Sequence, residues 1–472
     1  MLNLLRNKII VILIIYAGAN QPLHSQLWQR VGNGLDRFSN GLWTNIESNK
    51  LFVTGNFIHA DTLLCRGICF WDGKVFGKLT PPPACDLCGT GRLIKFDNKL
   101  FATGEYTVPS STDIGQVMQY ENESWSLSAR FPKNSAAGSI VLVNDKLLIL
   151  GLFDSISGIR ANCIALYNPE NNMWERFAQN EPFQNTFFHS EELLNNATYY
   201  KNEYYFSGNI NRDDDFKEIL RYDGKDWKPL QKGIFGGFAD ARGLIVYKDI
   251  LYVTGYFFKR DGNAGDYIMA WDGEKWFNPF PQIQYLYDIK NMAIISDQLY
   301  ISGSFIIPAD MDSLAYNIAR FDGCNFSAFG IKMKYPEDVE APFALAGFQG
   351  KIYASVRDSL QGKYAGYLIS FDENTPNYRT INITECPKEV DTVLTIELYP
   401  NPFDEWLTIK STKCFAGALI TMCDMLGRTV YHSRFNMKYE NRFDLMQLSG
   451  GLYYITVKTN EQVILKTKVI KL

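Results

Sequence analysis

Two short phrases recur at a common period through most of the chain, and this repetition constrains the fold more than any other feature. The first phrase is an apolar, strand-like run that ends in glycine, as in Leu51–Gly55. Its glycines lie 47 to 57 residues apart, at positions 55, 104, 151, 208, 255 and 303. A seventh, degenerate copy at 352–356 keeps the strand and lacks the glycine. Repeats of this length indicate a stack or ring of equivalent units.

The second phrase follows the first in the same phase and marks a turn. An aromatic residue precedes Asp-Gly or a relic of that pair, and another aromatic residue follows shortly afterwards. Aspartate and glycine both tolerate positive φ, so the pair suits a tight hairpin. We expect the aromatic residues to stack between neighbouring sheets. The seven copies begin at Trp71, Tyr120, Tyr167, Tyr222, Trp271, Phe321 and Phe371.

Each unit therefore reads as several short strands joined by turns. Units of about 50 residues with four short strands each predict a β-propeller. We count seven units, which predicts an all-β fold with seven blades over residues 26–385; an eight-bladed ring with one eroded unit and an open array are the alternatives. The segment Trp28–Gly32 resembles the strand after each Asp-Gly turn. We expect it to complete the last blade and close the ring, which removes open sheet edges.

This pattern resembles the kelch and galactose-oxidase central-domain propellers, in which a Tyr-Asp turn and a downstream Trp mark each blade. The chain departs from kelch repeats in having one glycine after the second strand, where kelch repeats have a pair. The resemblance covers residues 26–385 and implies the fold alone, because propellers host many unrelated functions.

The N-terminus reads as an export signal. Arg6 and Lys8 precede a short apolar run, and Ala17–Ala19 fits the small-x-small cleavage pattern. We predict a signal peptide over residues 1–19, with cleavage after Ser25 as the alternative. The run is shorter than the roughly 20 apolar residues that span a bilayer. We find no transmembrane segment elsewhere in the sequence, so we expect the mature protein outside the cytoplasm.

The last part of the chain has a different pattern. Residues 386–394 read as a linker, and residues 395–472 read as a run of alternating strands. That run contains, in order, Tyr-Pro-Asn-Pro at 399–402, Leu-Gly-Arg at 426–428, Gly-Leu-Tyr-Tyr-Ile at 451–455 and a lysine-bearing final strand. These motifs closely resemble the type A C-terminal sorting domain of the type IX secretion system.

The resemblance of the C-terminal segment implies a small antiparallel β-sandwich that the outer-membrane translocon of a Gram-negative bacterium recognises. It implies a secreted or cell-surface protein, with the tail removed in the linker and the cargo either released or attached to surface lipopolysaccharide. The translocon is then a partner of the C-terminal domain. An ordinary immunoglobulin-like binding module is the alternative.

Nine cysteines in an exported chain should mostly pair, and the odd number leaves at least one unpaired. Cys65, Cys69, Cys85 and Cys88 lie in or just after the first repeat with the spacing C-x3-C-x15-C-x2-C. Four thiolates at such a spacing are able to hold zinc tetrahedrally. Oxidation outside the cytoplasm favours two local disulfides instead, and the choice stays open here.

We find no singular catalytic constellation. The four histidines are His24, His59, His189 and His432, too few and too scattered for a copper or multi-histidine metal site. No G-x-S-x-G motif frames a serine, and no glycine-rich phosphate loop leads from a strand into a helix. The repeated acidic residues of the Asp-Gly phrases are expected to be structural, because a catalytic residue should occur once.

Two acidic turns invite a calcium interpretation. They are Asp213–Asp215 and Asp261–Asp266, and calcium takes several oxygen ligands from such loops. The full twelve-residue pattern is missing its central glycine, so we expect solvated hairpin tips. We therefore assign no catalytic, cofactor-binding or metal-binding residue and expect no cofactor.

Charge gives no reason to expect nucleic acid or a membrane as partner, because 47 basic and 51 acidic residues give a formal net charge of −4. The leading hypothesis is a monomeric, secreted or cell-surface propeller that binds a glycan or protein through loops near its axis. The alternative is a secreted polysaccharide hydrolase or lyase with carboxylates in the central funnel, since many acidic pairs are available. The sequence does not identify the ligand.

Overall fold

The computed structural model describes most of the chain from Trp28 onward. The described ranges are 28–79, 89–105, 116–132, 135–179, 193–212, 216–231, 233–236, 239–281, 285–306, 315–323, 326–329, 344–358, 365–372, 396–411, 415–437, 440–459 and 463–472. The predicted signal peptide 1–19 and the predicted linker 386–394 lie outside these ranges, so both stay predictions, as do the domain limits. Within them, no helix combines the length and apolar character that crossing a bilayer requires.

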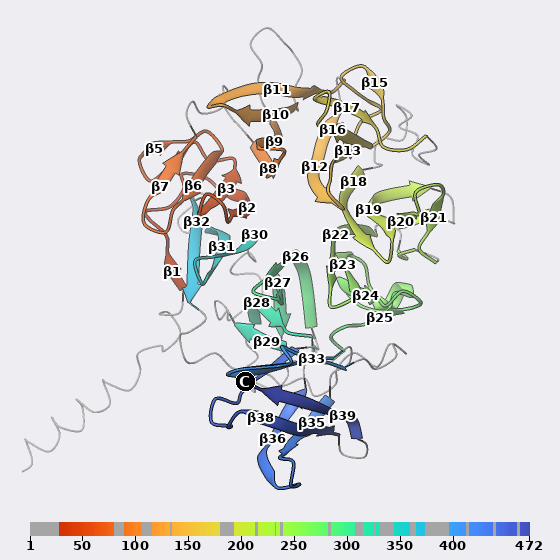
Figure 1. Ribbon diagram of the computed structural model, residues 1–472. Coiled ribbons are helices and arrows are strands. Elements are labelled where there is room, and N and C mark those ends of the chain that lie inside the picture. Colours follow the sequence, from red (N-terminus) through yellow and green to blue (C-terminus); the bar gives the residue numbers. More distant parts are fainter. Residues whose placement is uncertain are drawn as a thin grey trace, which may run out of the picture.

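Seven antiparallel sheets of four strands each follow one another within the described residues up to Asp372 (Figure 1). The first three are β2 (Ser39–Asn45), β3 (Lys50–Gly55), β6 (Ile68–Trp71) and β7 (Phe76–Lys78); β8 (Gly89–Phe96), β9 (Lys99–Glu105), β10 (Gln116–Glu121) and β11 (Ser124–Arg130); and β12 (Ala136–Val143), β13 (Lys146–Leu152), β16 (Ile164–Asn168) and β17 (Met173–Arg176).

The remaining four sheets have the same order of strands. They are β18 (Leu193–Tyr200), β19 (Glu203–Arg212), β20 (Phe216–Tyr222) and β21 (Trp227–Pro229); β22 (Asp240–Tyr247), β23 (Ile250–Tyr256), β24 (Ile268–Trp271) and β25 (Trp276–Phe277); β26 (Tyr285–Ile295), β27 (Gln298–Ile306), β28 (Ala315–Phe321) and β29 (Phe326–Phe329); and β30 (Ala344–Phe348), β31 (Lys351–Asp358), β32 (Ala365–Asp372) and β1 (Trp28–Arg30).

Three small elements lie in the connections between the second and third strands of their sheets. They are the hairpin β4 (His59–Ala60) with β5 (Leu63–Leu64), the hairpin β14 (Ser155–Ile156) with β15 (Ile159–Arg160), and the 3-10 helix η1 (Lys259–Asp261).

The first strands of the seven sheets form the inside of a ring. Each contacts the first strand of the next sheet in the order β2, β8, β12, β18, β22, β26, β30, and β30 contacts β2 again. Buried apolar side chains fill the spaces between successive sheets, as Phe101 of the second sheet and Ile149 of the third do in one cluster. The predicted all-β propeller architecture is confirmed. The kelch resemblance of its units stays a prediction.

The N-terminal strand closes the ring as predicted. β1 pairs antiparallel with β32, so that Trp28 lies opposite Phe371, and the Val31 amide donates a hydrogen bond to the Leu368 carbonyl at 2.8 Å. The Val31 side chain is only 4% exposed and packs with Phe348 of the same sheet. The last sheet therefore takes strands from both ends of the propeller segment.

The Asp-Gly phrases form the hairpins between the third and fourth strands. The Asp72 carboxylate accepts hydrogen bonds from the amides of Lys74 and Val75, both at 2.8 Å, and Asp223 and Asp272 make equivalent bonds. Gly73 has φ of 101°, which glycine adopts without steric cost. The hydrogen bonds from the backbone lower the pKa of Asp72. The repeated acidic residues therefore have the structural role that we expected.

The aromatic residues beside these turns pack both across the hairpin and between neighbouring sheets. Trp71 lies opposite Phe76 with ring centroids 5.0 Å apart, and Tyr222 and Trp227 lie 4.8 Å apart, because the two members of each pair are direct partners in the register. The contacts between neighbouring sheets that we had expected also occur, as where Tyr167 and Trp174 of the third sheet meet Phe101 of the second at 4.8 and 6.4 Å.

The repeated glycine marks a bulge in the inner strand. In five sheets this glycine pairs with the residue that precedes a break in the register, as Gly255 does with Ala241. The bulge brings the inner strand so near that an added Cβ at Gly255 would lie 1.8 Å from the Asp240 carbonyl oxygen. The glycine is therefore required by close backbone approach.

This close approach gives a testable prediction for Gly255→Ala. The added methyl group has to push the backbone of Asp240 away, which should lower the free energy of unfolding by about 1 to 3 kcal/mol. Thermal unfolding followed by circular dichroism measures the change. The control is Gly89→Ala, where the new Cβ would meet its nearest neighbour at 3.4 Å. Equal melting temperatures for the two variants would contradict the role of the bulge.

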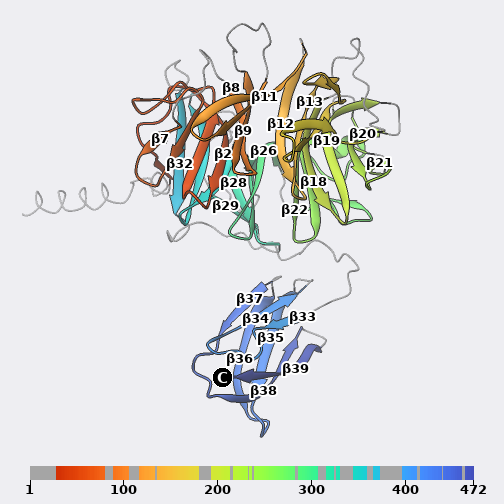
Figure 2. The same ribbon diagram turned by 45° about the horizontal axis from the view of Figure 1, so that its top comes forward.

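Residues from Ile396 onward form a second unit, a sandwich of two antiparallel sheets (Figure 2). One sheet has the order β33 (Ile396–Tyr399), β34 (Trp406–Ser411), β37 (Glu440–Asp444), and the other β36 (Thr429–Met437), β35 (Phe415–Cys423), β38 (Gly451–Lys458), β39 (Val463–Lys471). Leu407 of the first sheet and Ile420 and Ile455 of the second meet in one fully buried core. The predicted C-terminal β-sandwich is confirmed.

Candidate functional site

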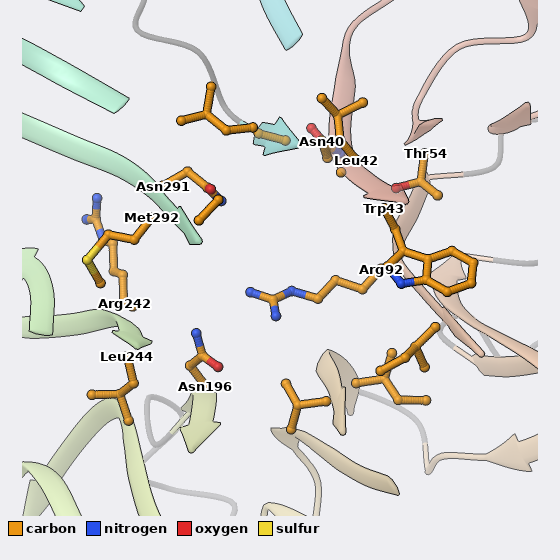
Figure 3. A pocket seen from close by; sticks show the side chains of 18 of the residues that line it. Asn40, Leu42, Trp43, Thr54, Arg92, Asn196, Arg242, Leu244, Asn291 and Met292 are labelled. Carbon is orange, nitrogen blue, oxygen red and sulfur yellow. The ribbon is translucent and has the colours of Figure 1, made fainter. Parts of the chain in front are cut away.

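The inner strands enclose a cavity of about 470 Å³ on the axis of the ring (Figure 3). All seven inner strands contribute side chains or backbone to its lining, for example Asn40 from β2 and Leu345 from β30. Its volume lies in the range of small-molecule sites, about 300–1,000 Å³. The described lining lies within the inner strands, with Thr54 of β3 and Thr254 of β23, and the expectation of binding through loops near the axis stays a prediction.

Polar side chains of three kinds gather in this cavity. Three are cationic, three are amides and two are hydroxyls, and Figure 3 shows Arg92 reaching into the open space. Among the described residues that line the cavity, none is Asp, Glu or His. The cationic, amide and hydroxyl side chains are Arg92, Arg242, Lys290, Asn40, Asn196, Asn291, Thr54 and Thr254.

The cations occupy the bulges of the inner strands. Arg92, Arg242 and Lys290 all fall within the interruptions of the register between the first and second strands of their sheets. A bulge residue has no partner across the ladder, and its side chain is turned away from the regular alternation. The bulge that requires the repeated glycine therefore also directs these side chains into the channel.

Hydrogen bonds fix the bulge that carries Arg92 from two sides. The Arg92 amide donates to the Thr103 hydroxyl of the same sheet at 3.1 Å. The Gly91 carbonyl accepts from the Thr54 hydroxyl of the preceding sheet at 2.8 Å. The base of the Arg92 side chain is therefore held before any ligand arrives, which lowers the entropic cost of binding.

Further along the same strands the lining becomes apolar. Trp43 and Ile94 follow the polar positions of β2 and β8, and β12 contributes only apolar residues such as Val141. The channel is thus polar and cationic around the bulges of most inner strands and apolar beyond them.

Arg242 and Lys290 interact with other protein groups, whereas Arg92 is without an ion-pair partner among the described residues. Arg242 donates from Nε to the Asp240 carboxylate at 2.7 Å. Arg92 forms no ion pair with any residue that the structure describes. Protein atoms surround its guanidinium although water reaches it, and this desolvation lowers its pKa, yet arginine keeps its charge at neutral pH. A cavity lined by one sign of charge concentrates ions of the other sign.

The cysteine cluster predicted from the sequence is only partly described. Cys65 and Cys69 are thiols with no exposed surface, whereas Cys85 and Cys88 lie outside the described residues. The hydrogen bond between the two thiols lowers the pKa of Cys65, and burial raises the pKa of Cys69 well above its ordinary value. The described part of the chain thus shows neither of the two disulfides that we expected.

The two histidines that the structure describes lie in different units and share no site. His59 Nδ1 lies 2.9 Å from the Asp36 carboxylate at an exposed position, and His432 is exposed on β36. Partial burial acts to raise the pKa of Asp36, but hydrogen bonds from His59 and Ile58 outweigh it and lower the pKa. His24 and His189 lie outside the described residues.

The second acidic turn is more ordered than a solvated hairpin tip. The Asn263 side chain is 8% exposed, and its amide donates to the carbonyls of Phe235 and Phe258 at 2.8 and 3.0 Å. The Asp266 carboxylate accepts from the Lys259 amide at 2.7 Å. These side chains tie loop backbone together, and no cluster of metal-ligating side chains occurs in the described ranges. Asp213–Asp215 lie outside them.

We did not single out the channel residues from the sequence, although a signal for them exists. Arg92, Arg242 and Lys290 lie twelve or thirteen residues before the repeated glycines at 104, 255 and 303. A search of that offset for polar residues finds all three. This offset identifies channel residues only when it is known that the glycine lies opposite a bulge in the inner strand.

Comparisons with solved structures give distant likenesses. PorZ, a surface component of the type-IX secretion system of Porphyromonas gingivalis, is 11% identical with a TM-score of 0.32; the match covers 92% of this chain and 65% of that one. An oligogalacturonate lyase in complex with manganese is 13% identical with a TM-score of 0.45, covering 74% and 95%. The propeller domain of the Trilobed protease of Pyrococcus furiosus is 10% identical with a TM-score of 0.42, covering 75% and 99%.

Similarities this distant indicate neither a ligand nor an activity for this protein. No curated protein matches the chain in sequence. Residues 397–471 match the family of secretion-system C-terminal sorting domains, which is the unit that folds here as a two-sheet sandwich. The chain is therefore a β-propeller protein whose C-terminal sorting domain directs it through the type IX secretion system to the cell surface or the extracellular space.

Proposed function

We propose that this protein is a non-catalytic binding protein of the cell surface and that its axial channel takes an acidic oligosaccharide. The observation that carries the proposal is the set of three cations, Arg92, Arg242 and Lys290, in a cavity whose described lining holds no carboxylate. Carboxylate or sulfate groups of such a ligand would meet guanidinium and ammonium donors, which form the stronger, charge-assisted hydrogen bonds.

The amides of the channel support a sugar as the carrier of these acidic groups. Asn40, Asn196 and Asn291 both donate and accept hydrogen bonds, as the hydroxyl groups of a saccharide require. The enclosed volume of about 470 Å³ suits a small ligand or the end of a chain better than a protein surface, which needs a broad contact area. An acidic protein segment is the competing ligand that the experiment has to distinguish.

The composition of the lining favours binding over hydrolysis. A glycoside hydrolase of the usual kind needs two carboxyl groups on opposite sides of the scissile bond. Among the described residues, the Asp240 carboxylate reaches the lining through Arg242, with which it already pairs. We therefore place the hydrolase or lyase second to the binding protein.

Arg92→Gln should weaken binding of an acidic oligosaccharide about 10- to 100-fold, because it removes a charge-assisted hydrogen bond worth about 1.5–3 kcal/mol. Calorimetry with a uronic-acid oligosaccharide measures this, and its neutral methyl ester should bind weakly to the unaltered protein. Arg160→Gln is the matched control, because Arg160 is exposed on β15 and does not line the cavity.

Three results would count against this proposal. Equal affinity for the ester and the acid would contradict the role of the ligand's charge. Unaltered binding by Arg92→Gln would show that the ligand does not bind in the channel. Cleavage of the oligosaccharide during the titration would favour the hydrolase or lyase. Binding that weakens as the salt concentration rises is expected, since the contacts are ionic.

A further inference from the structure

Two buried thiols meet in the first sheet, at a place unrelated to the channel. Cys65 follows the small hairpin β4–β5, and Cys69 lies four residues later on β6. Neither side chain has any exposed surface, and both belong to the apolar cluster between the first and last sheets, together with Leu368. Free cysteine is common in such cores. Two cysteines four residues apart in one cluster are a different case.

The backbone between the two cysteines is folded into a tight, fixed turn. Arg66 and Gly67 adopt left-handed conformations, with φ of 52° and 84°. The amides of Cys65 and Arg66 both donate to the Ile58 carbonyl, at 2.8 and 3.0 Å, and the Gly67 amide donates to the Phe57 carbonyl at 2.7 Å. This turn returns the chain so that both cysteine side chains lie in one buried cluster, where the Cys65 thiol donates to the Leu63 carbonyl at 3.3 Å.

We propose that Cys65 and Cys69 are joined by a disulfide in the exported protein. The fixed turn holds the two cysteines four residues apart with both side chains in the same buried cluster, and a disulfide joins them once the sulfurs reach the usual S–S distance of about 2.0 Å. The protein is exported from the cytoplasm, and disulfides persist in the oxidising compartments outside it. Cys85 and Cys88 then either pair with each other or stay as thiols. A zinc site of four thiolates is excluded, because two of the thiolates are used in the disulfide.

The oxidation balances with a protein disulfide as oxidant. The Cys65 thiolate attacks one sulfur of the disulfide of a thiol oxidase and forms a mixed disulfide, releasing one thiolate of the oxidase. The Cys69 thiolate then attacks the Cys65 sulfur and releases the second. Two thiols thereby lose two protons and two electrons, and the oxidase disulfide becomes a dithiol. Because both sulfurs are inaccessible in the folded propeller, the exchange has to precede the closure of this core.

The position of Arg66 between the cysteines makes the test direct. The full chain is purified from the surface or medium of the producing bacterium, denatured and alkylated without reduction, and digested with trypsin. Cleavage after Arg66 separates residues 51–66 from residues 67–74. We expect these two peptides to run as one disulfide-linked species, unalkylated, that separates on reduction.

The contrary outcomes are equally distinct in the mass spectrum. Alkylation of both peptides before reduction would overturn the proposal, and so would a link from either of them to residues 79–92, which carry Cys85 and Cys88. Zinc retained by the native protein and lost to a chelator would also overturn it. In Cys69→Ser the Cys65 peptide should become alkylated, which shows that the linked species of the unaltered protein arises from this pair.

Discussion

Removal of residues 395–472 is expected to leave nearly all of the protein in the periplasm. The sorting-domain match covers residues 397–471, and the type IX secretion system delivers proteins that carry this domain. Without it the chain keeps its N-terminal export signal, which is predicted to act at the inner membrane. Cell fractionation with immunoblotting of periplasm, cell surface and medium measures the distribution. Normal surface delivery of the truncated chain would refute the assignment.

The two cores of the chain make this experiment specific for sorting. The buried cluster of the C-terminal unit contains residues from Phe403 to Val469, and the clusters of the ring contain residues from Val31 to Phe371. No buried cluster among the described residues mixes the two sets. The truncated propeller should therefore fold and unfold as before, and its circular dichroism is the control. A misfolded truncation would be degraded instead of accumulating.

Much of the fold followed from residues that every repeat requires. Gly255 and its equivalents recur because the bulge opposite them leaves no room for a side chain, and Asp72 and its equivalents recur because their carboxylates hold the turn. Trp28–Gly32 could be placed beside the last sheet because an unpaired strand edge is unfavourable. Each of these features is required by the backbone geometry. All units share that geometry, so the residues recur in the sequence.

The candidate site lacked such a signal because its residues differ from one repeat to the next. Twelve residues before the repeated glycine one unit has Arg92 and another has Gly243, so the sheet requires no side chain at this position. The repeat pattern therefore reports what the units share, whereas the ligand would be recognised by what they do not share. The convergence of Arg92, Arg242 and Lys290 depends on the ring, which brings residues about 150 to 200 positions apart into one cavity.

The disulfide prediction shows the same limit. The four cysteines of the first repeat and their spacing were evident, but spacing alone does not determine which cysteines pair. The pairing that we now infer for Cys65 and Cys69 depends on the left-handed turn at Arg66 and Gly67. That turn is determined by hydrogen bonds to Phe57 and Ile58, which the sequence alone does not reveal.

Opening the ring is expected to cost a large part of the stability of the propeller. In the variant that replaces residues 28–31 with Gly-Pro-Gly-Pro, the chain length is kept while β1 loses hydrogen-bond donors and strand propensity. Loss of several backbone hydrogen bonds to β32 and of the buried Val31 side chain should lower the free energy of unfolding by roughly 4 to 8 kcal/mol. Typical domains have about 5 to 15 kcal/mol in total. Urea denaturation followed by tryptophan fluorescence measures the difference.

The control for this variant keeps the strand and changes an exposed side chain. Gln29 lies on β1 opposite Ser370 and is exposed, so Gln29→Thr should shift the unfolding midpoint little, within about 0.5 kcal/mol. The exposed edge of β32 in the Gly-Pro-Gly-Pro variant is also free to pair with another molecule, because an unpaired strand offers its backbone groups. Size-exclusion chromatography should then show oligomers that the Gln29→Thr protein does not form. A monomeric variant with an unchanged midpoint would mean that the contact of β30 with β2 holds the ring closed without β1.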